Sequence, residues 1–369
     1  NLKYFSKNNV LKNHKLVPQY VFGKGAISEL PSILEPKRKN DKNGVIFVVD
    51  EFFEDSSYLG FDIHEDDKFI FVKITEKEPT TYYVNELSRE IKQEFKKSPC
   101  AIVGIGGGSA MDIAKAISNL LTNPGNAEDY QGWDLVPNKG VFKVGIPTLS
   151  GTGAESTRTC VMINPASGLK LGMNSDKTVF DQVILDPDLT ATVPRDQYFW
   201  TGMDSYIHCI ESLAGNYRNA IGDAFSRQSL AMCKEVFLSD DMQSPDNREK
   251  MMVASCLGGF AIASSYVGVV HPFSAGLSVV LGTHHCVANC ITMRSMQEFY
   301  PKEFNEFWTM VERQQVQIPE GLCRNLREDQ YDMLYNSTII HEKPLVNALG
   351  EEFRETLNPQ RVRETFEQM

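Results

Sequence analysis

The stretch Ala101-Ile-Val-Gly-Ile-Gly-Gly-Gly-Ser-Ala-Met-Asp-Ile-Ala-Lys115 decides the fold of the N-terminal half of the chain. Its apolar residues 101–103 predict a short strand, and the pattern over 109–121 predicts a helix. Glycines between them let the backbone approach a pyrophosphate, and the helix N-terminus offers unpaired N–H groups and a positive dipole end. The stretch therefore predicts a phosphate-binding turn. A glycine turn without a ligand is the alternative, because such a motif alone is a weak signal.

Further apolar runs on both sides of the glycine loop predict additional strands. They cover 45–49, 69–74 and 144–146, and a helix is predicted over 82–97. Strands that alternate with helices imply a parallel sheet with helices on its faces. The charged run 37–43 predicts a surface loop.

Helical periodicity replaces these apolar runs after Pro194, and Pro187 and Pro194 mark the change. We therefore place a dinucleotide-binding α/β domain at residues 1–190 and an all-helical domain at residues 191–369. The charged tail from Asn358 predicts a terminal helix.

The composition is that of an ordinary globular protein and argues against several classes of partner. Of the 369 residues, 42% are apolar, and a net charge of −11 disfavours nucleic acid or an anionic membrane surface as a partner. The longest apolar runs are far shorter than a membrane span. Eight scattered cysteines without a Cys-x-x-Cys pair favour a reducing cytoplasm over a disulfide framework.

A second polar loop, Pro-Thr-Leu-Ser-Gly-Thr-Gly-Ala-Glu-Ser-Thr at 147–157, follows the fourth predicted strand. Its hydroxyls and glycines suit a ligand cleft at the carboxyl edge of a parallel sheet. Asp50, at the end of an early strand, can accept hydrogen bonds from both ribose hydroxyls and would repel a 2′-phosphate, which favours NAD over NADP. We expect Ser109 to cap the helix after the glycine loop, with Asp112 in its first turn. A plain loop and an ordinary turn carboxylate are the alternatives.

Asp204 and His208 stand four residues apart in the predicted helical domain, so both side chains lie on one helix face. His271 and His285 follow in the same half. One carboxylate and three imidazoles are enough ligands to hold a divalent transition metal with a position left open. A lone Asp-x-x-x-His pair is usually a surface pair, but four of the seven histidines fall within 208–285, which favours a metal-binding domain.

Taken together, these motifs resemble the iron-containing alcohol dehydrogenase family, also called group III. The similarity extends over nearly the whole chain, and its motifs occur in the order found in the family. These motifs lie at 106–115, 147–156, Lys170, 184–187, 201–208, His271 and 285–289. The resemblance implies a dinucleotide-binding α/β domain, an all-helical domain, and a cleft between them for NAD(P) and one divalent metal.

The resemblance also implies roles for individual residues. The metal ligands would be Asp204, His208, His271 and His285, with Fe(II) as the expected metal and Zn(II) close behind. The candidate nucleotide-binding residues are Asp50, Gly106, Gly107, Gly108, Ser109, Asp112, Thr148, Ser150, Thr152 and Lys170. Lys170 would lie near the nicotinamide or the ribose.

Two positions depart from the family pattern. Ala275 stands where the family usually has a second histidine, so the usual proton relay is absent. His284-His285-Cys286 replaces the usual Pro-His-Gly, which makes His284 the candidate catalytic residue for proton transfer. Cys286 and Cys290 are expected to be small buried residues rather than ligands.

The expected reaction is NAD-dependent oxidation of a primary alcohol by a homodimer. The overall sequence resembles the branch of the family that oxidises C8 of 3-deoxy-D-manno-octulosonate to an aldehyde, which is then aminated for a lipopolysaccharide sugar. Arg158 is a candidate partner for the substrate carboxylate, although a solvated arginine is the alternative. A dehydrogenase of short-chain alcohols or polyols, a lyase resembling dehydroquinate synthase, and a non-catalytic scaffold are the other hypotheses.

Overall fold

The computed structural model describes residues 14–41, 43–54, 63–73, 78–95 and 98–369. The chain divides into two compact units. The sheet unit comprises residues 14–149 and 154–192, and the helical unit comprises residues 150–153 and 193–369.

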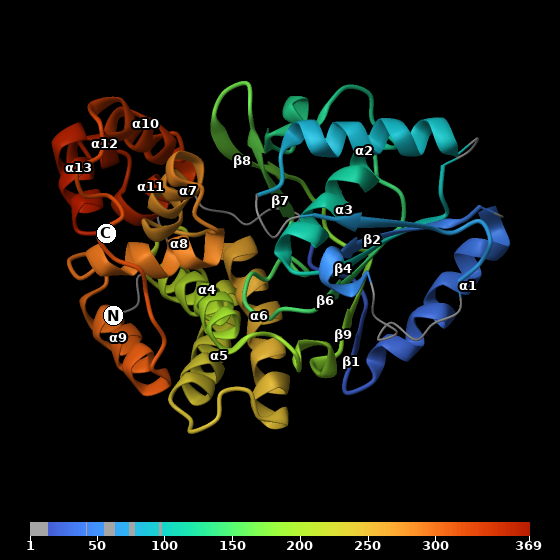
Figure 1. Ribbon diagram of the computed structural model, residues 1–369, viewed down its shortest axis with the longest axis horizontal. Helices are drawn as coiled ribbons and strands as arrows, with labels where there is room; N and C mark the ends of the chain where they lie inside the picture. Colours follow the sequence, from blue (N-terminus) through green and yellow to red (C-terminus); the bar gives the residue numbers. More distant parts are fainter. Residues whose placement is uncertain (1–13, 42, 55–62, 74–77, 96–97) are drawn as a thin grey trace. The chain divides into compact units, whose positions relative to one another are not determined.

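A six-stranded sheet in the order β1-β9-β6-β4-β2-β3 forms the centre of the sheet unit (Figure 1). All its neighbouring strands are parallel. The strands are β1 (Tyr20–Phe22), β2 (Val45–Asp50), β3 (Lys68–Val72), β4 (Ala101–Gly106), β6 (Lys143–Pro147) and β9 (Gln182–Leu185). The helices of this unit are α1 (Leu30–Asp41), α2 (Thr81–Glu94) and α3 (Gly108–Leu120), with the short 3-10 helices η1 (Ala26–Glu29), η2 (Glu51–Phe53), η4 (Ala127–Tyr130) and η5 (Pro187–Thr190). The predicted α/β architecture is confirmed.

Alternate residues of the central strands enter two apolar cores, one on each face of the sheet. Ile46 and Val48 of β2 pack with residues of α2 and α3. Val45, Phe47 and Val49 of the same strand pack with residues of α1 and η1. Because successive side chains of a strand point to opposite faces, a strand covered on both sides is apolar throughout. This explains why the central strands were predictable from short apolar runs.

A second, three-stranded sheet lies in the same unit and was not predicted from the sequence. Its strands are β5 (Gly132–Trp133), β7 (Thr159–Asn164) and β8 (Leu169–Asn174), and β7 pairs with β8 in antiparallel register. β8 buries only Lys170 and Met173 and shows no continuous apolar run, whereas the short apolar run 160–163 of β7, with Cys160 and Met162 buried, was not recognised as a strand.

The predicted surface loop at 37–43 is wrong, because most of this run forms the last turn of α1. Lys and Arg are good helix formers, and Leu30 and Leu34 bury one face of the helix. Arg38 is tied to Asp67, next to the start of β3, by two hydrogen bonds of 2.6 and 2.7 Å. The charged residues therefore extend the helix.

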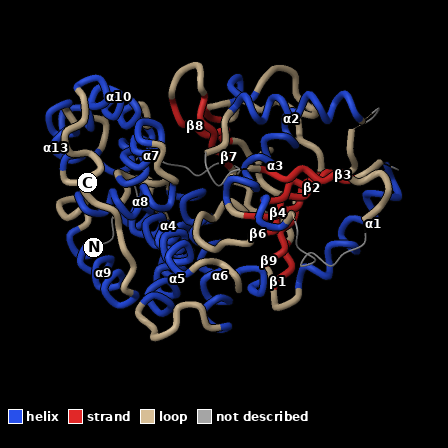
Figure 2. Tube along the Cα trace, in the orientation of Figure 1, coloured by secondary structure: helices blue, strands red, loops and turns tan. Residues whose placement is uncertain are grey.

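Helices joined by loops make up the helical unit (Figure 2). They are α4 (Arg195–Ala214), α5 (Ala220–Phe237), α6 (Pro245–Ser265), α7 (Val270–Leu281), α8 (His285–Thr292), η6 (Met293–Ser295), α9 (Pro301–Gln314), α10 (Glu328–Ile339), α11 (Glu342–Leu349), α12 (Phe353–Thr356) and α13 (Pro359–Glu367). The predicted helical C-terminal region and terminal helix are confirmed, and Asn358 caps α13 by accepting a hydrogen bond from Arg361 N.

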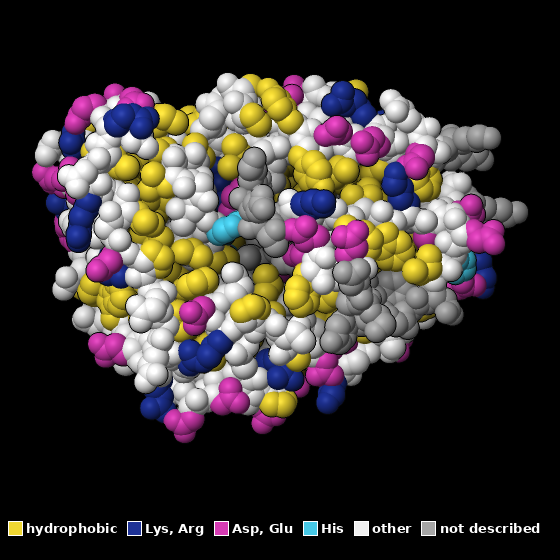
Figure 3. Space-filling model, viewed as in Figure 1, with side chains coloured by type: hydrophobic (Ala, Val, Ile, Leu, Met, Phe, Trp, Pro, Cys, Tyr) yellow, Lys and Arg dark blue, Asp and Glu magenta, His cyan; other side chains and the backbone are white. Residues whose placement is uncertain are grey.

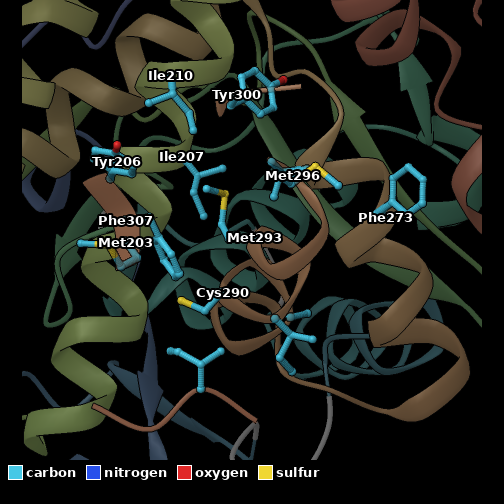
Figure 4. Packing of buried hydrophobic residues seen from close by; sticks show 14 of the residues in the cluster. Met203, Tyr206, Ile207, Ile210, Phe273, Cys290, Met293, Met296, Tyr300 and Phe307 are labelled. Atoms are coloured by element: carbon cyan, nitrogen blue, oxygen red, sulfur yellow. The ribbon is translucent and has the colours of Figure 1, made fainter. Parts of the chain in front are cut away.

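One large apolar core holds this unit together. Met203 and Ile207 of α4, Met293 of η6 and Phe307 of α9 belong to it, and their side chains lie close together in Figure 4. Cys290 of α8 is buried in the same cluster, as predicted for a small apolar residue. The packing fixes α4 and α8 side by side, and both helices carry predicted metal ligands.

The surface that Figure 3 shows has Asp and Glu side chains interspersed with Lys and Arg. Among the described residues, no single helix is long and apolar enough to cross a membrane. Within the described part of the chain, α6 and α7 reach that length and composition only when taken together, and they are bent by 106° at the break between them.

Candidate metal centre

Helix α4 presents Asp204 and His208 on one face, one helical turn apart. Both side chains are buried, and His208 Nε2 lies 3.2 Å from Asp204 Oδ1. The i, i+4 spacing read from the sequence brings them together as expected for a helix. This pair forms the base of the candidate centre.

Two further histidines reach the same carboxylate from other helices. His271, in the first turn of α7, places Nε2 3.2 Å from Asp204 Oδ1. His285, the first residue of α8, places Nε2 3.5 Å from Asp204 Oδ2. The rings of His208 and His271 stack at 4.8 Å between centroids, and the His271 and His285 rings are 5.5 Å apart. The structure thus gathers all four predicted ligands, which are 81 residues apart at the extremes of 204 and 285.

The spacing of the donor atoms suits a small divalent cation. Four ligands at about 2.0–2.1 Å from a tetrahedral metal lie about 3.3 Å from one another. Asp204 Oδ1 lies 3.2 Å from both His208 Nε2 and His271 Nε2, which matches that value, and His285 Nε2 lies 3.5 Å from the other oxygen, Oδ2. Asp204, His208 and His271 also form a group whose ligand atoms all lie within 4.8 Å of one another. Asp204, His208 and His271 therefore fit a divalent metal, and His285, outside this group, approaches the carboxylate through Asp204 Oδ2.

Neighbours on α8 surround the Asp204 carboxylate. Asn289 Nδ2 donates a 2.7 Å hydrogen bond to Asp204 Oδ1, which fixes the orientation of the carboxylate. Cys286 Sγ lies 4.0 Å from Asp204 Oδ2, and the residue is buried. Burial of Cys286 agrees with the prediction from the sequence.

The titration of these groups is strongly perturbed. Burial lowers the pKa of His208 to about 3, so its imidazole is neutral at pH 7 and has a lone pair to donate. Burial also opposes protonation of His271, but Glu211 and Asp204 outweigh it and raise the pKa of His271 to about 10. Burial disfavours the Asp204 carboxylate, yet His208 and His285 hold its pKa well below the usual range. Because ligands must be deprotonated, metal binding would release a proton from His271.

Glu211 contacts the centre but is not among the residues predicted from the sequence. It follows His208 by three residues on α4, is fully buried, and lies 2.5 Å from His271 Nδ1 through Oε2. The i, i+3 spacing from His208 on the same helix face was the available signal. It could not be recognised alone, because many helical glutamates share that spacing.

His284 is exposed and precedes α8 as its N-cap residue. The helix begins at His285, so His284 and His285 are not consecutive helical residues. The side chain of His284 is exposed and is not packed in the helical core. The backbone of His284 is not helical, with φ −59° and ψ 142°. Helical spacing therefore does not set the direction of its side chain relative to that of His285.

The predicted phosphate loop joins β4 to α3 in the sheet unit. β4 ends at Gly106, and α3 begins at Gly108. The expected cap at Ser109 is wrong: Gly107 occupies the N-cap without a side-chain hydrogen bond, and Ser109 lies inside the helix. The N-terminus of α3 therefore keeps backbone N–H groups that a phosphate could accept from.

Asp50 lies next to this loop, at the carboxyl end of the neighbouring strand. A Cβ at Gly106 would stand 2.9 Å from Asp50 Cβ and 2.7 Å from Ala110 Cβ, and Gly106 has a φ of 151°. Only glycine fits this close approach of the loop to Asp50. Asp50 Oδ1 accepts a hydrogen bond from Phe52 N, and burial raises the pKa of its carboxyl.

The second predicted loop divides between the units. Thr148 N donates to Gly106 O at 2.9 Å, so Thr148 stays beside the phosphate loop. Ser150 and Thr152 belong to the helical unit, where Ser205 Oγ donates to Gly151 O at 2.7 Å. The buried Ser150 hydroxyl makes no hydrogen bond to the residues that the structure describes.

Asp112 and Lys170 already have protein partners. Asp112 accepts a hydrogen bond from Val161 N at 2.9 Å, and burial raises its pKa to about 6. Lys170 lies on β8 and pairs with Glu78, with Nζ 3.0 Å from Oε2. Asp112 and Lys170 therefore stabilise the three-stranded sheet through these contacts. Both also remain predicted nucleotide-binding residues.

Arg158 does not have the environment that either hypothesis expected. Its guanidinium pairs with Asp134 and, at 3.2 Å, with Asp176, and its side chain is only 12% exposed. It is neither solvated nor available as an uncommitted partner for a carboxylate. The proximity of two acidic groups was not visible in the sequence, because Asp134 and Asp176 are far from Arg158 along the chain.

Comparison with known proteins covers both units. Residues 18–187 match the family model described as iron-containing alcohol dehydrogenase, and residues 199–336 match the model for the C-terminal part of that family. The chain is 31% identical over 293 residues to the NAD-dependent methanol dehydrogenase of Bacillus methanolicus, which covers 77% of this chain and 74% of that enzyme.

Two other similarities bear on substrate and fold. The chain is 36% identical over 191 residues to the sulfoacetaldehyde reductase of Bilophila wadsworthia, a match that spans 51% of this chain and 49% of that protein. The crystal structure of a 1,3-propanediol oxidoreductase superimposes with a TM-score of 0.82 at 20% identity, covering 96% of this chain and 99% of the other. That structural likeness shows the shared fold.

Proposed function

Because the chain belongs to the iron-containing alcohol dehydrogenase family, whose named members are oxidoreductases acting on CH–OH groups, we propose that it transfers a hydride from a primary alcohol to NAD. The observation that carries this proposal is the convergence of three imidazoles on one buried carboxylate, with each Nε2 3.2 to 3.5 Å from an oxygen of Asp204. A lone histidine pair would not support it.

The metal-binding residues in this proposal are Asp204, His208, His271 and His285. A divalent metal held by them, Fe(II) by preference or Zn(II), supplies Lewis-acid stabilisation of negative charge on the substrate oxygen. Asn289 keeps the Asp204 carboxylate oriented toward the histidines through its 2.7 Å hydrogen bond. The burial of Asp204 and His208 strengthens this electrostatic effect, since water is excluded from their surroundings.

The oxidation must dispose of one hydride and one proton. NAD, when bound, would accept the hydride from the alcohol carbon, and the hydroxyl proton would pass to water. We assign the proton transfer to His284, which is exposed and adjacent to His285. Histidine is the side chain best suited to proton transfer near neutral pH.

The glycine loop and its neighbours would bind NAD. Gly106, Gly107, Gly108 and Ser109 place the N-terminus of α3 against the pyrophosphate, as the break between β4 and α3 allows. Asp50, beside Gly106, would accept hydrogen bonds from the ribose and disfavour the 2′-phosphate of NADP. Thr148, Ser150, Thr152, Asp112 and Lys170 complete the proposed set.

For the substrate, we propose the C8 hydroxyl of 3-deoxy-D-manno-octulosonate, whose oxidation gives an aldehyde for amination in lipopolysaccharide sugar synthesis. The overall sequence likeness supports this choice. The similarity to a sulfoacetaldehyde reductase supports an acidic substrate more generally. A short-chain alcohol or polyol is the second candidate, which the similarity to a methanol dehydrogenase favours.

Two alternatives lose support. A lyase resembling dehydroquinate synthase would need a Glu ligand, whereas Asp204 holds that position and the family models are those of alcohol dehydrogenases. A non-catalytic scaffold would have no need to retain the four donors in this geometry.

We further propose a cytoplasmic homodimer. The described strand β1 pairs with β9 alone and carries two exposed aromatic side chains, Tyr20 and Phe22. An edge strand with exposed aromatics can pair with a second copy. Sedimentation of wild-type protein and of Tyr20→Lys/Phe22→Lys should show a dimer and a monomer, respectively, and a monomeric wild type contradicts the assignment.

The function is tested by following NADH formation at 340 nm with Fe(II) or Zn(II) supplied anaerobically. The panel contains methanol, 1,3-propanediol, 4-hydroxybutyrate, 2-hydroxyethanesulfonate and 3-deoxy-D-manno-octulosonate. We expect metal-dependent activity, with the highest kcat/KM for the octulosonate. His271→Ala should lower metal affinity at least about tenfold and lower activity with it. Full activity of that variant without bound metal would refute the proposed centre.

A further inference from the structure

Glu211 contacts the metal centre indirectly, through the proposed metal ligand His271. Its side chain is fully buried on α4, and its Oε2 lies 2.5 Å from His271 Nδ1. The other ring nitrogen, Nε2, points to Asp204 Oδ1 at 3.2 Å. We propose that Glu211 is a positioning residue of the centre, which holds His271 in the ring orientation and tautomer that metal binding requires. This inference rests on the proposed metal site.

The chemistry of imidazole explains the requirement. A metal binds an imidazole nitrogen that carries no proton, so a ligand bound through Nε2 keeps its proton on Nδ1. A carboxylate oxygen only accepts hydrogen bonds and therefore favours that proton on Nδ1. Glu211 thus keeps the proton on Nδ1 and leaves Nε2 as the nitrogen whose lone pair is available to a metal.

Glu211 also determines where the His271 backbone lies. α7 has no side-chain cap of its own at Val269, and Glu211 Oε1 accepts hydrogen bonds from Val270 N at 2.6 Å and His271 N at 3.4 Å. A carboxylate at a helix N-terminus is stabilised by the unpaired N–H groups and the dipole. One side chain of α4 therefore fixes both the start of α7 and the ring of its ligand.

The segment before α7 is shaped to permit this contact. A Cβ at Gly268 would stand 3.4 Å from the Cβ and Cγ of Glu211 and 2.6 Å from Tyr300 Oη, so a larger residue would push the segment away. Tyr300 Oη accepts a hydrogen bond from Val269 N at 3.3 Å. These contacts hold the backbone within reach of the carboxylate.

The arrangement distinguishes His271 from His208. The Nδ1 atom of His208 is buried and has no hydrogen-bond partner among the described residues. The ring of His208 is instead fixed by burial and by its place on α4 next to Asp204. Loss of the Glu211 carboxylate should therefore act on His271 specifically, without a similar effect on His208.

The substitution Glu211→Gln separates the two functions of this side chain, which are to cap α7 and to accept a hydrogen bond from His271 Nδ1. The amide oxygen can still accept from Val270 N, so the start of α7 is retained. The amide nitrogen then faces His271 Nδ1 as a donor, which favours a proton on Nε2, where it blocks metal binding. We expect a folded variant with about 10- to 100-fold weaker metal affinity.

The experiment measures Co(II) affinity by chelator competition and records the visible Co(II) absorption of wild type, Glu211→Gln and Glu306→Gln. Glu306 is a matched control, because it also bonds to a residue of α4, with Tyr206 Oη donating to Oε2 at 3.1 Å, away from the centre. Urea unfolding of the metal-free proteins checks that each variant is folded. We expect only Glu211→Gln to lose affinity and to change the Co(II) spectrum.

Unchanged affinity and spectrum in folded Glu211→Gln would overturn the role of Glu211. Absence of Co(II) binding in the wild type would instead overturn the metal site itself. If Glu211→Gln does not fold, proton–nitrogen spectra of zinc-loaded wild type labelled with ¹⁵N-histidine provide the test. A zinc-bound His271 with its proton on Nδ1 supports the proposal, and a proton on Nε2 overturns it.

Discussion

At the scale of single residues, Asp204 can organise the centre because its two oxygens face different partners. Oδ1 faces His208, His271 and Asn289, whereas Oδ2 faces His285. Removing one partner of a buried, paired charge leaves the others uncompensated. The histidines therefore act as a unit, and the effects of their single substitutions should not add.

His284 offers a test of proton transfer that does not involve a metal ligand. His284→Ala should lower turnover by about 10²-fold, the low end of acid–base contributions, and should remove one limb of the pH–rate profile. Its metal content should equal that of the wild type, because the side chain is exposed outside α8. His64→Ala is the control, since His64 belongs to the sheet unit and is also exposed. Normal turnover with an unchanged pH profile would remove His284 from the mechanism.

Asp50 should decide between the two nicotinamide cofactors. Its carboxylate stands beside Gly106 of the phosphate loop, where a ribose 2′-phosphate would meet a negative charge in a partly buried place. Asp50→Gly should therefore reduce the ratio of kcat/KM for NAD to that for NADP, by at least about tenfold. Steady-state kinetics with both cofactors measure the ratio. Wild-type activity with NADP equal to that with NAD would show that Asp50 lies elsewhere than at the ribose.

At the scale of secondary-structure elements, the backbone is strained in the segment between α6 and α7, close to the predicted metal-binding residue His271. Tyr266 has φ 60° and ψ 169°, a region that is almost exclusive to glycine, and lies five residues before His271. Tyr266→Gly and Tyr266→Ala both remove the ring, but only glycine adopts this backbone without strain. The glycine variant should be more stable than the alanine variant by about 1–3 kcal/mol in urea unfolding.

Glu249 on α6 supplies the control for this comparison. It is exposed in the same helix with ordinary helical geometry. Glu249→Ala should be more stable than Glu249→Gly by about 1 kcal/mol, the opposite order. The same order at both positions would show that Tyr266 is not strained.

The ion pair that anchors α1 should make stability depend on pH. Burial tends to raise the pKa of Asp67, but Arg38 and the amides of Val45 and His64 outweigh it, so the pKa is lowered. Its contribution is present above the ordinary carboxyl pKa and is lost as the pH falls through the lowered value. Asp67→Asn should cost about 3 kcal/mol at pH 7, because it breaks a buried pair, and the cost should shrink progressively as the pH falls below the ordinary carboxyl pKa of about 3.9.

Glu35→Gln on the same helix is the matched control. Glu35 pairs with Lys39 at the surface, where both side chains are more than half exposed. Its substitution should leave the free energy of unfolding nearly unchanged at pH 7 and at pH 3, because an exposed ion pair is screened by solvent. An Asp67→Asn effect that stays constant between pH 7 and pH 3 would contradict the assigned ion pair.

Prediction from sequence succeeded where the local pattern determines the structure. Strands β2 and β4 are buried on both faces, so their apolar runs are visible, and Asp204 and His208 follow from helical spacing. Spacing alone could not bring His271 and His285 to the same carboxylate, because they come from other helices; the family resemblance supplied them. The lone helical Glu211 and the ion pairs of Arg158 depend on tertiary packing, which no local pattern reveals.

At the scale of the whole molecule, the proposed metal site and the glycine loop proposed for NAD belong to different parts of the chain. The predicted metal ligands belong to the helical unit, and the glycine loop belongs to the sheet unit. Any ligand that binds only the folded state raises stability, by about 2.7 kcal/mol at a concentration 100 times its Kd. Metal and NAD should therefore each raise the unfolding temperature of the wild type, and a chelator should reverse the effect of metal.

Two substitutions should separate these effects. Asp204→Asn should abolish the rise caused by metal while keeping the rise caused by NAD. Gly107→Val should do the reverse, because its side chain would fill the start of α3, where even a Cβ approaches Leu149 Cδ1 to 2.8 Å. Cys290→Ser, a core substitution whose sulfur lies 4.0 Å from Trp200 O, should keep both shifts even if the protein is less stable overall. Thermal unfolding with and without each ligand, compared within each variant, provides the measurement. If Asp204→Asn also lost the NAD-dependent shift, NAD binding would depend on the metal centre, and the assignment of the two ligands to separate sets of residues would fail.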